Sequence, residues 1–439
     1  MRLLKWLYPG LRIKRWFFLS IVGIFLFLIG LGMVWGHQVI GFAERQVLSL
    51  LVLLIGERKP VLYGLVFMGI GIISIILAVK YAVKSILEII VPEQEAQLID
   101  VLFERRLLQS GPRIVVIGGG TGLSVLLRGL KHYTSNITAI VTVADDGGSS
   151  GRLRGDMGIL PPGDIRNCVL ALADTEPLLE KLFQYRFSGG ELAGHSFGNL
   201  LIAAMTSITG DFQLAIKEFS KVLAVRGRVL PVTASDITLV AEMHDGSIIV
   251  GESKVSECGC DIKSLRLDPP NVQPLPEVLQ AIAEADALVL GPGSLFTSVI
   301  PNLLVSGMSQ AIARSAATKI YICNVMTQPG ETTQFTASQH VDAIQRLANA
   351  RIVDFVLVNT ARIKGDLLSK YRAQNSAPVL VDMHRLNQLG VRVVADDLIQ
   401  QGSVVRHDSE KLARRVMRLI IKNTILTERR RRERKQKRN

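Results

Sequence analysis

Cysteine is scarce in this chain. Only four occur among 439 residues, at positions 168, 258, 260 and 323. A disulfide framework needs a much denser set, so these thiols indicate a reducing compartment. Cys258 and Cys260 are separated by one glycine and have no second pair of metal ligands at a suitable spacing. We therefore interpret them as structural residues and not as a metal site.

The body of the chain also lacks an excess of positive charge. The net charge is +13 at pH 7, but residues 1–15 contribute +5 and residues 428–439 contribute +6, which leaves +2 for the rest. A body so close to neutral gives no support for a nucleic-acid-binding surface. We expect the basic tail to contact the anionic inner leaflet of a membrane. RNA or DNA contact and a solvated, disordered tail are the alternatives for that segment.

Two long apolar runs lie near the N-terminus. Residues 16–36 are 21 consecutive residues without a charge, and residues 61–79 are another 19. Each run is long enough to cross the hydrocarbon core as a helix, and the first is too long for a signal peptide and lacks a cleavage site. The flanking basic residues predict two spans with both ends of the chain in the cytoplasm. Residues 47–55 are too short to span and are expected in the membrane interface.

The remaining sequence predicts a Rossmann-like α/β fold. Short β-branched runs alternate with helical segments, which is typical of a doubly wound, mostly parallel sheet. Strands are expected at 113–117, 138–143, 286–290, 319–323, 353–358, 379–382 and 392–394. Helices are expected at 123–131, 164–172, 197–209, 212–224, 276–285, 333–349 and 409–422. A small antiparallel insertion is expected at 237–252, around the turn signal Asp245-Gly246. The predicted parts are a membrane anchor (1–91), a linker (92–112) with an amphipathic piece from Glu93 to Leu108, the α/β domain (113–427) and the basic tail (428–439).

A glycine-rich loop follows the first predicted strand of this domain. Gly118, Gly119, Gly120 and Gly122, with Thr121 among them, lead directly into a helix. Backbone N–H groups at a helix N-terminus favour a phosphate through hydrogen bonds and the helix dipole. The dinucleotide fingerprint requires a glycine where Leu123 stands, which disfavours NAD or FAD. The loop therefore predicts a phosphate-binding site of another class.

Two carboxylates follow the second predicted strand. Asp145 and Asp146 stand about where a Rossmann-type protein holds a ribose hydroxyl, and they precede Gly147-Gly148-Ser149-Ser150-Gly151. Side chains of adjacent residues at a strand end tend to point to opposite faces, so we expect only one of the two to meet a given ligand atom. They are the candidates for any catalytic role and for a Mg²⁺ ion beside a phosphate. A solvated turn is the alternative.

Two further loops are expected beside this site. Asp164 is expected as a helix N-cap, with Arg166 and Asn167 in the first turn close enough to reach a phosphate or a sugar. Residues 194–198 match G-x-S-x-G, but the strand that a hydrolase nucleophile requires before it is missing, so a loop-to-helix cradle is favoured. In that cradle Ser196 caps the helix, Asn199 faces the ligand, and His195 contacts phosphate or satisfies a buried hydrogen bond.

A second strand–glycine–helix arrangement occurs later in the chain. The predicted strand at 286–290 leads into Gly291, Pro292, Gly293 and Ser294. Their position at a new helix start predicts either another phosphate cradle or a loop that closes over the first ligand. Asn324 and Gln328 follow the next strand and are expected at the same edge of the sheet.

The motifs together resemble one known family. They are GGGTG at 118–122, ADDGGSSGRLR at 144–154, PPGDIRN at 161–167, GHSFGNL at 194–200, GPGSLFTSVIPNLL at 291–304 and CNVMTQPGET at 323–332. This series resembles the gluconeogenesis factor (YvcK) family, which is similar to the CofD-like 2-phospho-L-lactate transferases, and it covers roughly residues 113–422. The resemblance implies a Rossmann-like domain that binds a nucleotide sugar, typically UDP-N-acetylglucosamine, and a link to cell shape and to growth on gluconeogenic carbon.

The same resemblance implies roles for individual residues. Gly119, Gly120, Thr121 and Gly122, with Gly293 and Ser294, would surround the diphosphate. Asp145 or Asp146 would occupy the position that meets the acceptor in the transferases. Many members of the family lack a membrane hairpin, so residues 1–110 lie outside the resemblance.

These observations lead to one functional expectation and two alternatives. We expect a membrane-tethered, cytoplasm-facing binding protein for a UDP-sugar that regulates cell-wall precursor supply, requires no cofactor to bind its ligand, and is a candidate homodimer. The enzymatic alternative is transfer of a phospho-lactyl-type group from a nucleoside diphosphate carrier, with Mg²⁺ neutralising the leaving diphosphate. A dinucleotide oxidoreductase is disfavoured by Leu123.

Overall fold

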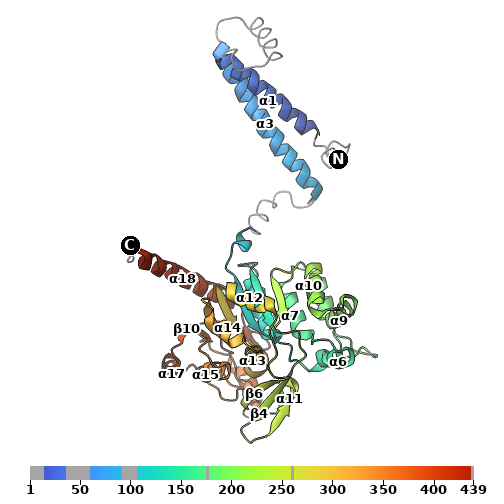
Figure 1. Ribbon diagram of the computed structural model, residues 1–439, viewed down its shortest axis with the longest axis vertical. Helices are drawn as coiled ribbons and strands as arrows, with labels where there is room; N and C mark the ends of the chain where they lie inside the picture. The colour runs from blue at the N-terminus through green and yellow to red at the C-terminus, as the bar shows by residue number, and fades with distance from the viewer. Residues whose placement is uncertain (1–13, 36–59, 91–105, 175–176, 259–261, 437–439) are drawn as a thin grey trace. The chain divides into compact units, whose positions relative to one another are not determined.

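The structure is a computed structural model that describes residues 14–35, 60–90, 106–174, 177–258 and 262–436. The chain divides into two compact units, Met1–Arg105 and Arg106–Asn439. The expected interfacial segment at 47–55, most of the amphipathic piece after Glu93, and Cys260 lie outside the described residues. Figure 1 shows the elements of both units.

The first unit contains a pair of apolar helices, α1 (Lys14–Trp35) and α3 (Pro60–Ile90). Their segments Trp16–Val34 and Val61–Ala82 are long and apolar enough to cross a membrane. The helices approach closely where glycines face each other, because a Cβ added to Gly30 would lie 2.5 Å from the Gly64 carbonyl oxygen. Small residues at such a crossing allow close backbone packing, which favours association of helices in lipid. The predicted pair of apolar helices is confirmed, and α3 extends beyond the apolar run.

The second unit is built on a seven-stranded parallel sheet of order β10-β9-β8-β7-β1-β2-β3. The strands are β1 (Ile114–Gly118), β2 (Ile137–Val141), β3 (Arg228–Pro231), β7 (Ala287–Leu290), β8 (Thr318–Ile322), β9 (Phe355–Asn359) and β10 (Arg392–Asp396). Five of them, β1, β2, β7, β8 and β9, consist almost wholly of buried β-branched and aliphatic residues, as expected for a sheet covered on both faces. The predicted doubly wound α/β fold is confirmed.

Helices surround the strands of the sheet (Figure 1). They are α5 (Gly120–Leu130), α6 (Gly148–Met157), α7 (Gly163–Leu172), α8 (Pro177–Gln184), α9 (Phe197–Thr209), α10 (Phe212–Val222), α11 (Glu252–Glu257), α12 (Pro276–Glu284), the π-helix Leu295–Val299, α13 (Ile300–Leu304), α14 (Met308–Arg314), α15 (Ala337–Ala348), α16 (Gly365–Ala373), α17 (Met383–Gln388) and α18 (Ser409–Gln436). Helix α5 packs against both α7 and α18. The crossing with α18 is tight, because a Cβ on Gly129 would overlap the Ser409 carbonyl oxygen.

Two small antiparallel sheets complete the unit. The predicted insertion is confirmed and has three strands, β4 (Thr238–Met243), β5 (Ile248–Val250) and β6 (Ile262–Asp268), in the order β5-β4-β6. A hairpin of β11 (Ile399–Gln401) and β12 (Val405–His407) was not predicted from the sequence. The strand expected at 379–382 is absent: the preceding Pro378 forms an isolated bridge with Met326, and residues 379–382 join no sheet. Helix α18 continues through Gln436, so most of the basic tail is helical.

Candidate functional site

The strand order reverses between β1 and β7. Strands β1, β2 and β3 follow one another to one side, and β7, β8, β9 and β10 follow one another to the other side. In open α/β sheets, ligands bind outside the carboxyl ends of the strands at such a switch point. The loops that leave β1 and β7 at this point are the two glycine-rich loops, because Ile117 and Leu290 are paired in the register of the two strands.

The two glycine-rich loops pack against each other. A Cβ added to Gly122 would lie 2.5 Å from the Pro292 carbonyl oxygen, so a larger residue would push the loops apart. Gly293 adopts φ +154°, which favours glycine, and a Cβ added to it would lie 3.3 Å from the Gly119 carbonyl oxygen. Their junction opens into a cavity of about 450 Å³, a size typical of ligand pockets. Among the residues expected at the nucleotide site, those lining this cavity are Gly119, Gly120, Thr121, Gly122, Gly293, Ser294 and Asn324.

Side chains after β8 hold the second loop in place. The Asn324 amide accepts a hydrogen bond from the Gly293 N–H at 3.2 Å and donates one to the Gly293 carbonyl at 2.8 Å. Gln328 accepts from Asn324 at 3.2 Å and donates to the Ser294 hydroxyl at 2.8 Å. The expected edge position of Asn324 and Gln328 is confirmed, and both position the loop that would hold a phosphate. Gly291 does not line the cavity and packs against Leu123 instead.

The opposite wall of the cavity comes from a part of the chain that the sequence did not indicate. Tyr371 and Gln374 at the end of α16, together with Arg406 and His407 of the β11–β12 hairpin, line it. Arg406 is the only lysine or arginine among the described residues of the lining. Burial lowers the pKa of His407 to about 4, so its imidazole is neutral at pH 7. The only sequence signal for this wall was the short apolar segment on each side of Gly402, Leu398-Ile399 before it and Val404-Val405 after it.

Asp145 and Asp146 point to different partners. An oxygen of Asp145 accepts the Gly147 N–H at 3.0 Å, whereas Asp146 accepts the Ser253 N–H at 2.9 Å from the start of α11. The two side chains therefore point in different directions, as expected for adjacent residues at the end of a strand. Neither residue lines the cavity, and the described residues contain no group of three His, Cys, Asp or Glu side chains that could hold a metal ion. The pair does not form a converging Mg²⁺ site by itself.

Asp164 corrects one expectation and adds a group beside the glycine loop. Helix α7 begins at Gly163 with Pro162 as its N-cap residue and no side-chain cap, so Asp164 is not the N-cap. Its carboxylate accepts a hydrogen bond from the Gly120 N–H, at the start of α5. Desolvation and the neighbouring Asp145 carboxylate raise the pKa of Asp164 to about 7. Desolvation also raises the pKa of Glu252 to about 7. Asp164 was not expected as a site residue, because the role of helix N-cap already accounted for an aspartate at this position.

A polar network lies beside α7 and α9. The Arg166 guanidinium donates to Ser196 and, at 2.7 Å, to the Asn199 side chain, and it also bonds Asn167 at 2.9 Å. The Ser149 hydroxyl lies 3.1 Å from His195 Nδ1. None of these residues lines the cavity.

Ser196 is the N-cap of α9, as expected, because its hydroxyl accepts the Asn199 N–H. This use of the hydroxyl and its bond from Arg166 leave Ser196 as a capping residue and not a nucleophile. Burial and the nearby Arg152 guanidinium lower the pKa of His195. Its Nδ1 lies 3.1 Å from the Ser149 hydroxyl, in line with the expected alternative of a histidine that satisfies a buried hydrogen bond.

Comparison with known proteins identifies relatives of both units. A family model described as 2-phospho-L-lactate transferase CofD matches residues 114–399. The gluconeogenesis factor of Bacillus subtilis is 51% identical over 311 residues, which cover 70% of this chain and 98% of that protein. A Nostoc sp. protein named for the same factor is 49% identical over 416 residues, covering 93% of this chain and 91% of its own.

A solved structure shows that the second unit's fold forms by itself. The crystal structure of a UPF0052 family member from Bacillus halodurans has a TM-score of 0.68 and 53% identity, and the match covers 71% of this chain and 99% of that one. Since the CofD match begins at residue 114, the part shared with this shorter relative is the second unit. The relative therefore folds without a counterpart of the two apolar helices.

Proposed function

The chain belongs to the gluconeogenesis factor family, and from this premise we propose that it binds UDP-N-acetylglucosamine in the cavity between its two glycine-rich loops. In this proposal the protein reports the level of that nucleotide sugar and so regulates cell-wall precursor supply and cell shape. The observation that carries it is the meeting of two loop-to-helix cradles at the switch point of one parallel sheet.

The geometry suits a diphosphate flanked by two larger groups. The Gly119–Gly122 loop opens helix α5, and Gly293 with Ser294 opens the π-helix Leu295–Val299, so both bring backbone N–H groups to a helix start. The N–H groups of Gly120 and Gly293 are already bonded to Asp164 and Asn324, so the ligand would use the other N–H groups of these loops. Arg406 on the opposite wall supplies a full positive charge, which a doubly charged diphosphate needs in a partly desolvated site. The part of the cavity beside Tyr371 and Gln374 would accommodate the base or the sugar.

The chemical character of the lining favours binding over catalysis. The described lining residues include no carboxylate and no cysteine, and burial lowers the pKa of the one histidine, His407, to about 4, which makes its imidazole a weak proton acceptor. A covalent or acid–base mechanism requires an activated nucleophile or a proton acceptor within reach of the substrate. We infer a ligand-binding regulator for which no cofactor is required.

The location of this activity is the second part of the proposal. The two apolar helices are suited to span a membrane, and the basic residues before the first span and after the second favour placing both ends of the chain in the cytoplasm. The nucleotide-sugar site would then be open to the cytoplasmic pool of wall precursors.

Calorimetric titration of residues 106–439 tests the ligand. UDP-N-acetylglucosamine, UDP, GDP and NAD are titrated with and without Mg²⁺, and incubated samples are examined for product. We expect selective binding of the UDP-sugar and no product. Arg406→Gln should weaken binding about 10- to 100-fold, the value of a hydrogen bond to a charged group. Arg362→Gln is the matched control, since Arg362 is equally exposed and does not line the cavity. Absence of heat with every UDP compound would reject the proposal.

Transfer of a phospho-lactyl-type group is the second candidate function, because the matching family model describes a 2-phospho-L-lactate transferase. Preference for GDP with Mg²⁺, followed by turnover with an acceptor, would favour it. Its proposed site includes Asp145 and Asp146, so an Asp145→Asn/Asp146→Asn variant that kept full turnover would remove that assignment.

A further inference from the structure

A groove with several cations lies at the amino-terminal edge of the parallel sheet. Its volume is about 420 Å³, and its charged lining residues are Arg392, Arg415, Arg418 and Lys422, with no carboxylate among the lining residues. We call these four residues, together with Phe355, the cationic groove. Phe355 and Arg392 are the first residues of β9 and β10, and the Arg392 guanidinium lies 5.3 Å from the Phe355 ring centroid.

Three of the four cations are not neutralised. Arg415 pairs with Asp396 at 3.3 Å. Arg392, Arg418 and Lys422 form no ion pair with any carboxylate in the described part of the chain. Arg418 and Lys422 are separated by one helical turn of α18, so both face the same side of that helix. The groove therefore presents three available positive charges within one concave surface.

Helix α18 carries more positive charge to the same edge. It begins near the carboxyl edge, where the Asp408 N–H bonds the Leu398 carbonyl, and it reaches the opposite edge, where Asn423 donates to Thr318 at the start of β8 at 2.6 Å. The helix continues to Gln436, about 20 Å beyond Asn423 at 1.5 Å per residue. This extension contains the sequence ERRRRERKQ.

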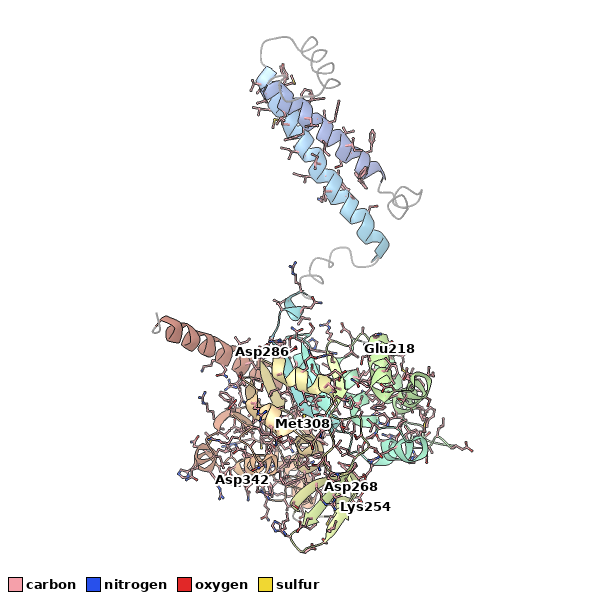
Figure 2. All side chains as sticks on the ribbon, in the orientation of Figure 1. Glu218, Lys254, Asp268, Asp286, Met308 and Asp342 are labelled. Atoms are coloured by element: carbon pink, nitrogen blue, oxygen red, sulfur yellow. The ribbon has the colours of Figure 1, made fainter. Side chains whose placement is uncertain are left out.

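The chain enters the second unit at this same edge. Residues 106–109 are helical and lead into Arg113, just before β1 begins. Arg113 contacts Asp286, which precedes β7, and Figure 2 shows Asp286 toward this end of the unit, with Asp268 and Lys254 toward the other. β1 and β10 are four strands apart in the sheet, or about 19 Å at 4.8 Å per strand. The segment before Arg106 therefore joins the second unit at the same edge of the sheet as the groove.

From these relationships we propose that the amino-terminal edge of the sheet binds anionic phospholipid. The cationic groove takes up headgroup phosphates, and the basic extension of α18 lies along the same surface. The nucleotide-binding cavity, at the carboxyl edge, then faces away from the lipid and stays open to solvent. This inference is independent of which nucleotide sugar binds, because it concerns the opposite edge of the sheet.

Vesicle binding by residues 106–439, which lack the apolar helices, tests this surface. Sedimentation is measured with phosphatidylcholine vesicles and with vesicles in which phosphatidylglycerol replaces about a third of that lipid. We expect binding only to the anionic vesicles, decreasing with salt. The Arg392→Glu/Arg418→Glu/Lys422→Glu variant should bind on the order of 100-fold more weakly, given the attraction of each cation to an anionic surface.

A control variant tests whether binding depends on the groove itself or only on the total positive charge of the protein. Lys217→Glu/Lys254→Glu/Arg266→Glu reverses three exposed cations on α10, α11 and β6, away from the groove, and should change binding by less than about twofold. Equal weakening by both variants would overturn the proposal. So would complete loss of binding on deletion of 424–439 with no effect of the groove variant. Displacement of the protein from the vesicles by RNA at equal phosphate concentration would reassign the groove to nucleic acid. Unchanged thermal melting of each variant confirms that it is folded.

Discussion

Asn324 binds both backbone groups of Gly293, accepting from its N–H at 3.2 Å and donating to its carbonyl at 2.8 Å. The side chain comes from the loop after β8, and the glycine from the loop after β7. One amide therefore fixes the backbone of the second glycine-rich loop in the orientation that lines the cavity. Hydrogen bonds of this kind between neighbouring βα loops position a binding site without contributing to the core.

Removal of this clamp should weaken ligand binding more than it weakens the fold. In Asn324→Leu both bonds are lost, and at about 1 kcal/mol each we expect roughly a tenfold or larger loss of affinity for UDP-N-acetylglucosamine. Calorimetric titration measures the loss. Asn387→Leu, on the exposed surface of α17, is the control and should bind normally. Normal affinity in Asn324→Leu would show that the second loop does not hold the ligand.

The contact between the two loops should make Gly122 intolerant of any side chain. The Cβ in Gly122→Ala would lie 2.5 Å from the Pro292 carbonyl oxygen, where only backbone could yield. We expect a loss of about 1–3 kcal/mol in the free energy of unfolding, together with loss of ligand binding. Gly155→Ala is the matched control, because Gly155 lies in α6 with nothing within 4 Å of the added carbon. Chemical denaturation should find the control equal to the parent or more stable by up to about 1 kcal/mol.

Arg166 is expected to act on stability and not on affinity. Its guanidinium joins Ser196, Asn199 and Asn167, and the residue is 8% exposed and does not line the cavity. Arg166→Met leaves buried acceptors without a donor, so we expect destabilisation of about 2–4 kcal/mol. Thermal melting and titration at a temperature where the variant is folded separate the two effects. A stable variant with no affinity would instead restore Arg166 to the ligand site.

The raised pKa of Asp164 predicts a pH dependence of stability. Its folded pKa of about 7 exceeds the ordinary value of 3.8, so between these pH values the folded state binds more protons than the unfolded state. Stability contributed by this group therefore falls as pH rises from about 4 to about 7 and is constant above. His407 has the opposite sign, because its pKa is lowered from 6.5 to about 4.

Comparison of the parent with Asp164→Asn isolates this effect. The variant cannot titrate at this position, so the difference in melting temperature between the two proteins should increase in favour of the variant as pH rises from 5 toward about 7.5. The contribution of His407 is common to both and cancels. A difference that does not change with pH would contradict the raised pKa.

Much of the fold could be predicted from the sequence, and some of it could not. Most of the strands and helices that were expected lie within a few residues of the observed elements, because burial on both faces of a parallel sheet requires continuous apolar runs, which are visible in the sequence. Strands β3 and β6 and several helices, such as α6, α8 and α16, were not expected. The strand expected at 379–382 was wrong: Val379 and Val381 pack against the core, but Leu380 is 67% exposed and the segment joins no sheet. An apolar composition favours burial of a segment, but it does not show that the segment pairs as a strand.

The sequence by itself determined the family, the α/β class, the two apolar helices and the glycine-rich loops, because each depends on local backbone chemistry at fixed spacing. Only the tertiary structure decided which polar groups share the cavity. Arg406 and Tyr371 reach it because a distant hairpin and the end of α16 fold over the switch point. Asp164 left its expected capping role because the start of α5 lies beside it. Such contacts depend on how helices and loops pack across the sheet, and no local sequence pattern indicates them.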